Sequence, residues 1–158
     1  MGKTKLSAIP YDERTDDQKL ESNWRKASRL YERRDWSAAI MRAATSTEIA
    51  ANIYVRHFLV TEHKLPHSYV DALLVSANGL DGKFKRLIRP AAEHRGTWQV
   101  FKPLQKRIEA LHDHRNGIAH SGHFKDENDA KEAFICGLEI IRALAPNESK
   151  KLLLPFKS

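Results

Sequence analysis

Apolar residues recur every three or four positions along most of this chain, and this spacing limits its fold more than any other feature of the sequence. One face of an α-helix repeats at that interval, whereas a half-buried β-strand alternates at every second residue. We find no convincing alternation of the second kind, no internal repeat and no low-complexity linker. Proline and glycine, which end or interrupt helices, separate the apolar stripes. The sequence therefore predicts an all-α protein, a bundle of four or five helices with short connections.

The N-terminal half contains two expected helices. The first covers about residues 15–34, with Thr15 or Asp16 in position to cap its first amide groups. The second is longer, from about 35 to 63, and its alanine-rich middle is apolar on most sides. A helix that is apolar nearly all round usually lies in the middle of a bundle. Glu48 falls within this middle segment, so we expect its carboxylate either to point outward or to have a partner.

The C-terminal half is divided by its glycine and proline residues. Ser68 can cap a helix, and we expect Asn78-Gly79 and Gly82 to interrupt it, with a short apolar segment following before Pro90. A further helix begins after Gly96 and carries Pro103 within its first two turns, where proline is better tolerated than deeper inside.

A chain of 158 residues suits one domain, because it can bury a core without disulfide or metal staples. We expect a polar N-terminal arm at 1–14, the helical domain at 15–145 and a C-terminal tail at 146–158. The last helix of the domain begins at Asp126 or Asn128, either of which can serve as its cap. The apolar end of the tail can pack back on the bundle or on a partner.

Composition narrows the function classes. The net charge of +7 favours polyanionic partners. The single cysteine, Cys136, excludes an intramolecular disulfide framework and a CxxC metal knuckle, and its apolar neighbours predict a small buried side chain. No run approaches the roughly 18 apolar residues that span a bilayer, and no apolar run follows the basic N-terminus as in a secretory signal. We therefore expect a cytoplasmic protein with no membrane partner.

The segment 111–122, Leu-His-Asp-His-Arg-Asn-Gly-Ile-Ala-His-Ser-Gly, carries most of the chemistry in the sequence. Arg115 is followed directly by Asn116 and, after four intervening residues, by His120. RNA cleavage without a metal, in which the 2′-hydroxyl attacks the adjacent phosphate, needs a proton-transfer group near neutral pH and a fixed cation. Histidine supplies the first, and the planar fork of arginine matches phosphate oxygens. These residues favour an endoribonuclease with Arg115 on the phosphate, His120 as general acid or base, and Asn116 positioning one of them.

This motif resembles the signature of the HEPN superfamily, in which four to six residues separate an Arg, often followed by Asn, from a His. The context is similar too: an apolar helix leads into the motif, a capped helix follows it, and the alanine-rich helix with Glu48 resembles the family's central helix. The resemblance covers 15–145, with 111–122 as its specific part. It implies a metal-independent endoribonuclease acting on RNA without a cofactor, as a toxin or antiviral defence effector, with an antitoxin or regulatory protein as partner. It also implies a homodimer, because the family's motif commonly lies beside a two-fold axis.

The spacing of the motif raises a geometric question. In an unbroken helix Arg115 and His120 diverge by about 140° around the axis, whereas Asn116 and His120 share a face. Asn-Gly favours a helix end or turn, so we expect a break at Gly117 that lets the arginine and the histidine converge. Glu48 is a candidate for orienting either of them.

Other readings of the motif stand beside the catalytic one. Arginine and histidine near a helix junction often bridge helices, and many HEPN domains are non-catalytic modules that dimerise, bind RNA or recruit a partner. A second alternative is a HEPN protein regulated by a nucleotidyltransferase; that group often carries Tyr two residues after the His, where this chain has Gly122. Four histidines lie within twelve residues, but without a standard zinc spacing, so we expect no metal site. They are His112, His114, His120 and His123.

A basic run lies just before the motif, with eight basic residues and one acid, Glu93, between 83 and 107. Such a run can attract a phosphate backbone, and Trp98 and Phe101 within it can stack on bases, although we expect these two aromatic side chains in the core. The final helix is acidic, so any cationic surface is one-sided. The candidates for RNA binding are Lys83, Lys85, Arg86, Arg89, Lys102, Lys106 and Arg107.

Overall fold

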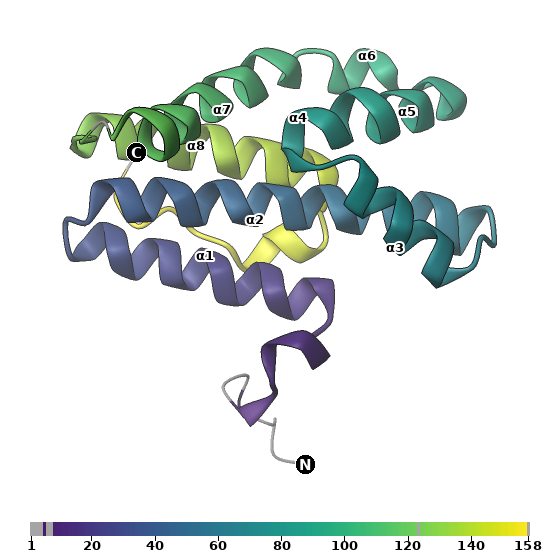
Figure 1. Cartoon of the computed structure of the whole chain (residues 1–158), viewed down its shortest axis with the longest axis horizontal. Coiled ribbons are helices and arrows are strands. Elements are labelled where there is room, and N and C mark those ends of the chain that lie inside the picture. The colour runs from purple at the N-terminus through teal and green to yellow at the C-terminus, as the bar shows by residue number, and fades with distance from the viewer. Residues whose placement is uncertain (1–4, 6–7, 123, 158) are drawn as a thin grey trace.

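The computed structural model describes residues 5, 8–122 and 124–157, and every regular element in this part of the chain is helical (Figure 1). The long helices are α1 (Asp16–Glu32), α2 (Trp36–Arg56), α7 (Leu104–Ser121) and α8 (Glu127–Leu144). The shorter helices α3 (His67–Ser76), α4 (Gly79–Lys83), α5 (Arg89–Arg95) and α6 (Trp98–Phe101) connect α2 to α7. The all-α prediction is confirmed, although short helices bring the total above the four or five expected. None of the helices in the described residues is both long and apolar enough to cross a membrane.

Helix α2 lies in the middle of the bundle, as the sequence predicted. It packs against α1 and α8, and α4 and α7 cover a further part of its surface (Figure 1). Ala39, Ala43 and Ala50 are fully buried along it. Such small side chains let neighbouring helices approach closely, which is why an alanine-rich helix takes the central place.

Aromatic side chains fill the core between α1 and α8, and the C-terminal residues close over it. The rings of Trp24 and Phe134 meet edge to face with centroids 5.2 Å apart, an arrangement that suits the ring quadrupoles. Trp24 Nε1 donates to the backbone oxygen of Leu153 at 2.8 Å, and Leu152 is buried. The tail therefore packs back on its own bundle, one of the two possibilities expected. Cys136 is buried in α8 as predicted, and burial raises the pKa of its thiol.

Most helix ends follow the capping residues read from the sequence. Thr15 caps α1 and Asp126 caps α8, each within a reciprocal capping box, and Asp35 accepts an amide hydrogen bond at the start of α2. The prediction for Ser68 was wrong. Pro66 stands at the N-cap of α3 and Ser68 lies inside the helix, because proline needs no amide partner at a helix start.

The stretch between α3 and α7 is more helical than expected. Asn78 separates α3 from α4 as expected. Helix α4, a π-helical turn at Phe84–Ile88 and α5 then follow one another without a gap, so neither Gly82 nor Pro90 interrupts them. Pro90 falls in the first turn of α5, where its missing N–H costs least. Pro103, expected inside one helix, instead separates α6 from α7.

Helix α7 is unbroken through Gly117, and the predicted break there was wrong. The helix ends at Gly122, whose φ of 60° lies in the left-handed region. An internal glycine costs a helix only about 1 kcal/mol relative to alanine, less than the burial of Ile108 and Leu111 on the same helix contributes. Arg115 and His120 thus belong to one continuous helix.

Candidate functional site

A cavity of about 640 Å³ lies between α2, α4 and α7, and the predicted motif lines one wall of it. Helix α7 contributes Arg115, Asn116 and His120, α2 contributes Glu48, and the π-helical turn after α4 contributes Arg86. A π-helical turn adds a residue and rotates the side chains that follow, and such turns are frequent at functional sites. We call this space the α7 cavity; its charged and motif residues are Glu48, Asp81, Arg86, Arg115, Asn116 and His120.

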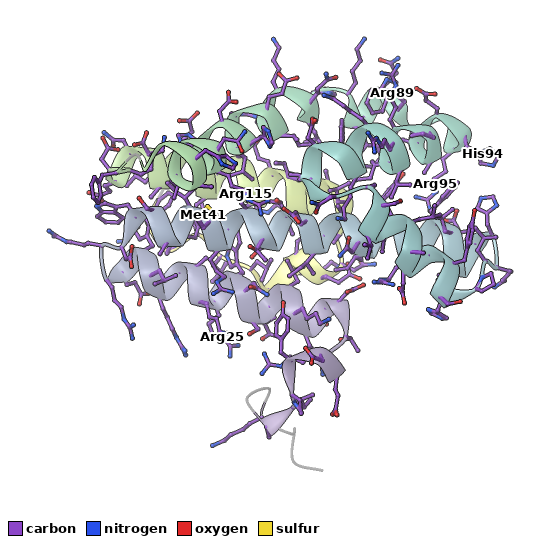
Figure 2. All side chains as sticks on the ribbon, in the orientation of Figure 1. Arg25, Met41, Arg89, His94, Arg95 and Arg115 are labelled. Atoms are coloured by element: carbon purple, nitrogen blue, oxygen red, sulfur yellow. The ribbon has the colours of Figure 1, made fainter. Side chains whose placement is uncertain are left out.

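Arg115 reaches the cavity because it continues the buried stripe of α7. Ile108 and Leu111 are 1% and 2% exposed, and Arg115 follows Leu111 by one helical turn on the same side. Its Nη1 donates to Oε1 of Glu48 on α2, and Figure 2 shows Arg115 reaching from α7 toward α2 beside Met41. The side chains of Arg115 and Glu48 are 39% and 21% exposed. A partner for Glu48 was one of the two expectations, and it proves to be the motif arginine.

Asn116 is held by a neighbour on its own helix. Its amide nitrogen donates to Nε2 of His112 at 2.9 Å, and both residues line the α7 cavity. His112 was not predicted from the sequence to be part of the site. Its spacing of four residues from Asn116 was the signal that could have placed it there, because residues four apart are neighbours on a helix surface.

His120 lies in the last turn of α7, exposed at the rim of the cavity. Because the helix is unbroken, Arg115 and His120 diverge by about 140° around its axis. Both line the same cavity, but the arginine turns inward against α2 while the histidine faces solvent. The local convergence expected from a break at Gly117 is therefore absent within one chain.

Lys83 differs from the other candidates for RNA binding. It is only 6% exposed, so it is not one of the surface cations. Burial lowers the pKa of its ammonium and the charge of Arg115 lowers it further, while Glu48 opposes the shift. Lys83 therefore lies within electrostatic reach of the Glu48–Arg115 pair.

The remaining candidates are exposed, and several already have acidic partners. These residues are Lys85, Arg86, Arg89, Lys102, Lys106 and Arg107. Salt bridges join Lys85 to Asp81 at 3.1 Å, Arg89 to Glu93 at 2.7 Å, and Arg107 to Glu139 at 2.7 Å. Exposed pairs of this kind are weak, so they leave these cations able to exchange partners with a phosphate backbone.

The two aromatic residues of the basic run belong to the core, as expected. Phe101 is 7% exposed, and its ring lies 5.2 Å from that of Tyr54. Trp98 is partly buried against the core, where it contacts Phe84, and the guanidinium of Arg89 lies 5.0 Å from its ring. Stacking of bases on these rings is therefore not part of the site.

The histidines of the motif region point in different directions. His114 turns toward α8, where its Nε2 lies 3.2 Å from Glu132. His123 lies outside the described residues. Within the residues that the structure describes, no group of three or more His, Cys, Asp or Glu side chains is arranged to hold a metal ion.

Comparison with known proteins adds nothing to this geometry. No protein-family model, curated protein or solved structure matches this chain. The α7 cavity offers a guanidinium that bonds Glu48 through one nitrogen among the described contacts, an amide fixed by His112, and an exposed imidazole. These groups can bind an anion and can transfer a proton at the mouth of the cavity.

Proposed function

We propose that this protein is a metal-independent endoribonuclease of the HEPN type, in which Arg115 binds the phosphate and His120 transfers the proton. The observation that carries the proposal is the placement of Arg115, fixed by Glu48, in a cavity that Asn116 and His120 also line. A fixed cation beside a proton-transfer group is what cleavage of a phosphodiester by its own 2′-hydroxyl needs. The resemblance of the motif to the HEPN signature supports the same assignment.

In this reaction the 2′-oxygen bonds to phosphorus, the bond to the 5′-oxygen breaks, and a 2′,3′-cyclic phosphate and a 5′-hydroxyl remain. Two protons move: one leaves the 2′-hydroxyl and one reaches the departing 5′-oxygen. His120 carries one of these transfers, as base or as acid, and water carries the other. Arg115 donates its other N–H groups to the phosphate oxygens as their negative charge grows. Asn116, already oriented by His112, adds a neutral donor beside it.

A second copy completes the site in this proposal. Since Arg115 and His120 diverge on one helix, a two-fold pairing near the end of α7 would let the histidine of one copy act beside the arginine of the other. An apolar contact for such a pairing is present: Phe124 is 99% exposed in the connection to α8, and it borders a small pocket with Trp36 and Ile118. A role as a toxin or defence effector restrained by a protein partner follows from the resemblance alone.

The rival function is a non-catalytic module that binds RNA or a partner. The exposed position of His120 in the last turn of α7 favours this alternative. In that case the cavity binds phosphate, but no bond is broken, and substitution of His120 leaves the biological effect unchanged.

The test compares purified wild type with Arg115→Ala and His120→Ala on mixed RNAs in the presence of a chelator. His57→Ala serves as the matched control, because His57 is an exposed histidine at the far end of α2. We expect wild type and the control to produce cyclic phosphate ends, and His120→Ala to cut about 10²–10⁴-fold more slowly. If wild type cuts nothing, or both site variants cut as fast as wild type, the nuclease proposal is wrong. Light scattering then shows whether one copy or two is present.

A further inference from the structure

The α7 cavity has a second wall, which the motif does not build. Residues 78–82, from the connection after α3 and from α4, line it together with Ser76, and we call residues 78–82 the α4 wall. The cavity measures about 640 Å³, within the range of roughly 300–1,000 Å³ that small-molecule sites occupy. A phosphate held by Arg115 fills only part of such a space, so the α4 wall is left to meet another part of the substrate.

Buried apolar side chains form part of the cavity surface. Leu80 belongs to the α4 wall and is 9% exposed, while Ile108 and Leu111 of α7 are 1% and 2% exposed. An apolar surface of this kind favours a flat ring that gives up its water on contact. Proteins that recognise single-stranded RNA combine such contact with the face of a base and hydrogen bonds along its edge.

The α4 wall also carries two polar side chains, Asn78 and Asp81. The side chain of Asp81 is 34% exposed and meets Lys85 at 3.1 Å, an exposed pair that is weak enough to exchange for a ligand. Among the described residues Asn78 makes no side-chain capping bond to α4, whereas Asp126 at the same position of α8 does. The wall therefore offers a carboxylate with two acceptor oxygens and, three positions before it, an amide that can donate.

We propose that the α4 wall binds a guanine base, whose N1–H and N2 amino group donate to Asp81 and whose O6 accepts from Asn78. Guanine is the one RNA base that presents two adjacent N–H donors beside an acceptor on its Watson–Crick edge, and a carboxylate accepts two such donors at once. With Arg115 on the phosphate that follows this base, cleavage occurs after guanosine. The inference rests on the proposed function, which it deepens by naming the nucleotide that the site selects.

The experiment measures the affinities of three 3′-monophosphates, those of guanosine, inosine and adenosine, by calorimetry. Inosine lacks only the N2 amino group, and adenosine presents a single donor and an acceptor at the same edge. We expect wild type to bind guanosine 3′-monophosphate about tenfold more tightly than the inosine compound and about 10–100-fold more tightly than the adenosine compound. Equal affinities for the three compounds would overturn the proposal before any variant is made.

Asp81→Ala should reduce the preference for guanosine over inosine to less than about twofold, because no carboxylate remains to read the amino group. Glu93→Ala is the matched control, since Glu93 forms the same kind of exposed pair, with Arg89, at a place that does not line the cavity. The control should keep the full preference. A preference that survives Asp81→Ala, or that Glu93→Ala abolishes as well, would also overturn the proposal.

Asn78→Ala tests the contact to O6. Guanosine and inosine both carry O6, so this substitution should weaken both compounds by the same factor, about twofold to tenfold, and leave their ratio as in wild type. An unchanged affinity for both, or a changed ratio, would contradict the pairing of Asn78 with O6.

These binding measurements do not depend on cleavage. A wild type that prefers guanosine but cuts no RNA refutes the nuclease and leaves the guanine site standing. A wild type that cuts equally after all four nucleotides and shows no binding preference refutes the guanine site alone.

Discussion

Helix α2 contributes to two arginine–carboxylate clusters, and the two are built differently. Near its middle, Glu48 holds Arg115 in the α7 cavity. At its C-terminal end, Arg56 lies in a second cavity of about 530 Å³, which we call the Arg56 cleft. The cleft is lined by Asp16, Asp17, Tyr54, Arg56, Arg95 and Glu148, among others.

Arg56 bonds carboxylates from two other helices. Its Nε donates to Asp16 of α1 at 2.7 Å, and its Nη1 donates to Asp71 of α3. Burial disfavours the charge, yet the two carboxylates keep the pKa of Arg56 above its ordinary value. An arginine that ties three helices together in this way acts as a brace.

The charge balance of the two cavities differs. Two arginines and two carboxylates line the α7 cavity: Arg86 and Arg115 with Glu48 and Asp81. Two arginines and three carboxylates line the Arg56 cleft: Arg56 and Arg95 with Asp16, Asp17 and Glu148. Of the two, the α7 cavity is therefore the less acidic and the better suited to an anion.

Replacing each arginine by alanine should distinguish Arg115 from Arg56 most strongly. Arg115→Ala should lower the rate of RNA cleavage about 10²–10³-fold, because it removes the donors to the developing phosphate charge. Arg56→Ala should leave the rate within a few-fold and instead lower the melting temperature by roughly 2–8 °C. Cleavage and thermal unfolding of both variants check this, and a loss of activity in Arg56→Ala would break the distinction.

Removing one carboxylate from each cluster gives a smaller contrast. Glu48→Gln should reduce the maximal rate about tenfold to a hundredfold, because Arg115 loses its orientation while phosphate still binds. Asp16→Asn should leave cleavage unchanged, since Arg56 keeps Asp71 and does not meet the substrate. Steady-state kinetics of the two variants decide, and equal rates for both would remove any positioning role of Glu48.

The exposed cations outside the cavity should tune RNA affinity more gently. Lys102→Ala combined with Lys106→Ala should flatten the salt dependence of RNA binding by about 1.4 in the logarithmic slope, the value for two lost contacts to single-stranded RNA. The control pair is Lys26→Ala with Arg29→Ala on α1, which removes the same charge from exposed positions across α2. Binding isotherms at several salt concentrations measure the slopes, and identical slopes for the two pairs would remove this surface from the binding face.

The smallest effect concerns the Arg56 brace and pH. The hydrogen bond from Arg56 lowers the pKa of the Asp71 carboxyl below its ordinary value of 3.8. A carboxylate with a depressed pKa in the folded state stabilises the protein above its unfolded pKa and ceases to do so as the pH falls through the folded value. The gap in melting temperature between wild type and Arg56→Ala should therefore shrink below about pH 4. Because Asp71 is exposed, salt should shrink the gap in melting temperature as well. A gap that widens in acid would contradict the role of the Arg56–Asp71 pair.

The parts of the fold that could be predicted from the sequence are those that local signals determine. The apolar stripes and caps of α1, α2 and α8 depend on residues within one or two turns, so they could be read without the rest of the molecule. The Asn-Gly pair in α7 is also a local signal, but it failed because the packing of Ile108 and Leu111 holds the helix together past Gly117. Tertiary contacts overruled local preference there.

The candidate site was predictable in its residue types and not in its geometry. The motif residues Arg115, Asn116 and His120 all line one wall of the cavity. Glu48 could be singled out because a carboxylate among alanines needs a partner. The burial of Lys83 was not predictable, because it follows from the meeting of α2, α4 and α7, which are far apart in the chain.

Contact between Arg115 and RNA can be followed through the arginine Nε–Hε resonances during titration with a short 2′-O-methyl RNA, which lacks the nucleophile and stays intact. Assignments come from Arg115→Lys and Arg56→Lys. We predict that the Arg115 resonance shifts in a saturable way while those of Arg56 and Arg95 stay in place. A shift of Arg56 as large as that of Arg115, or an RNA that binds without moving Arg115, would contradict the account.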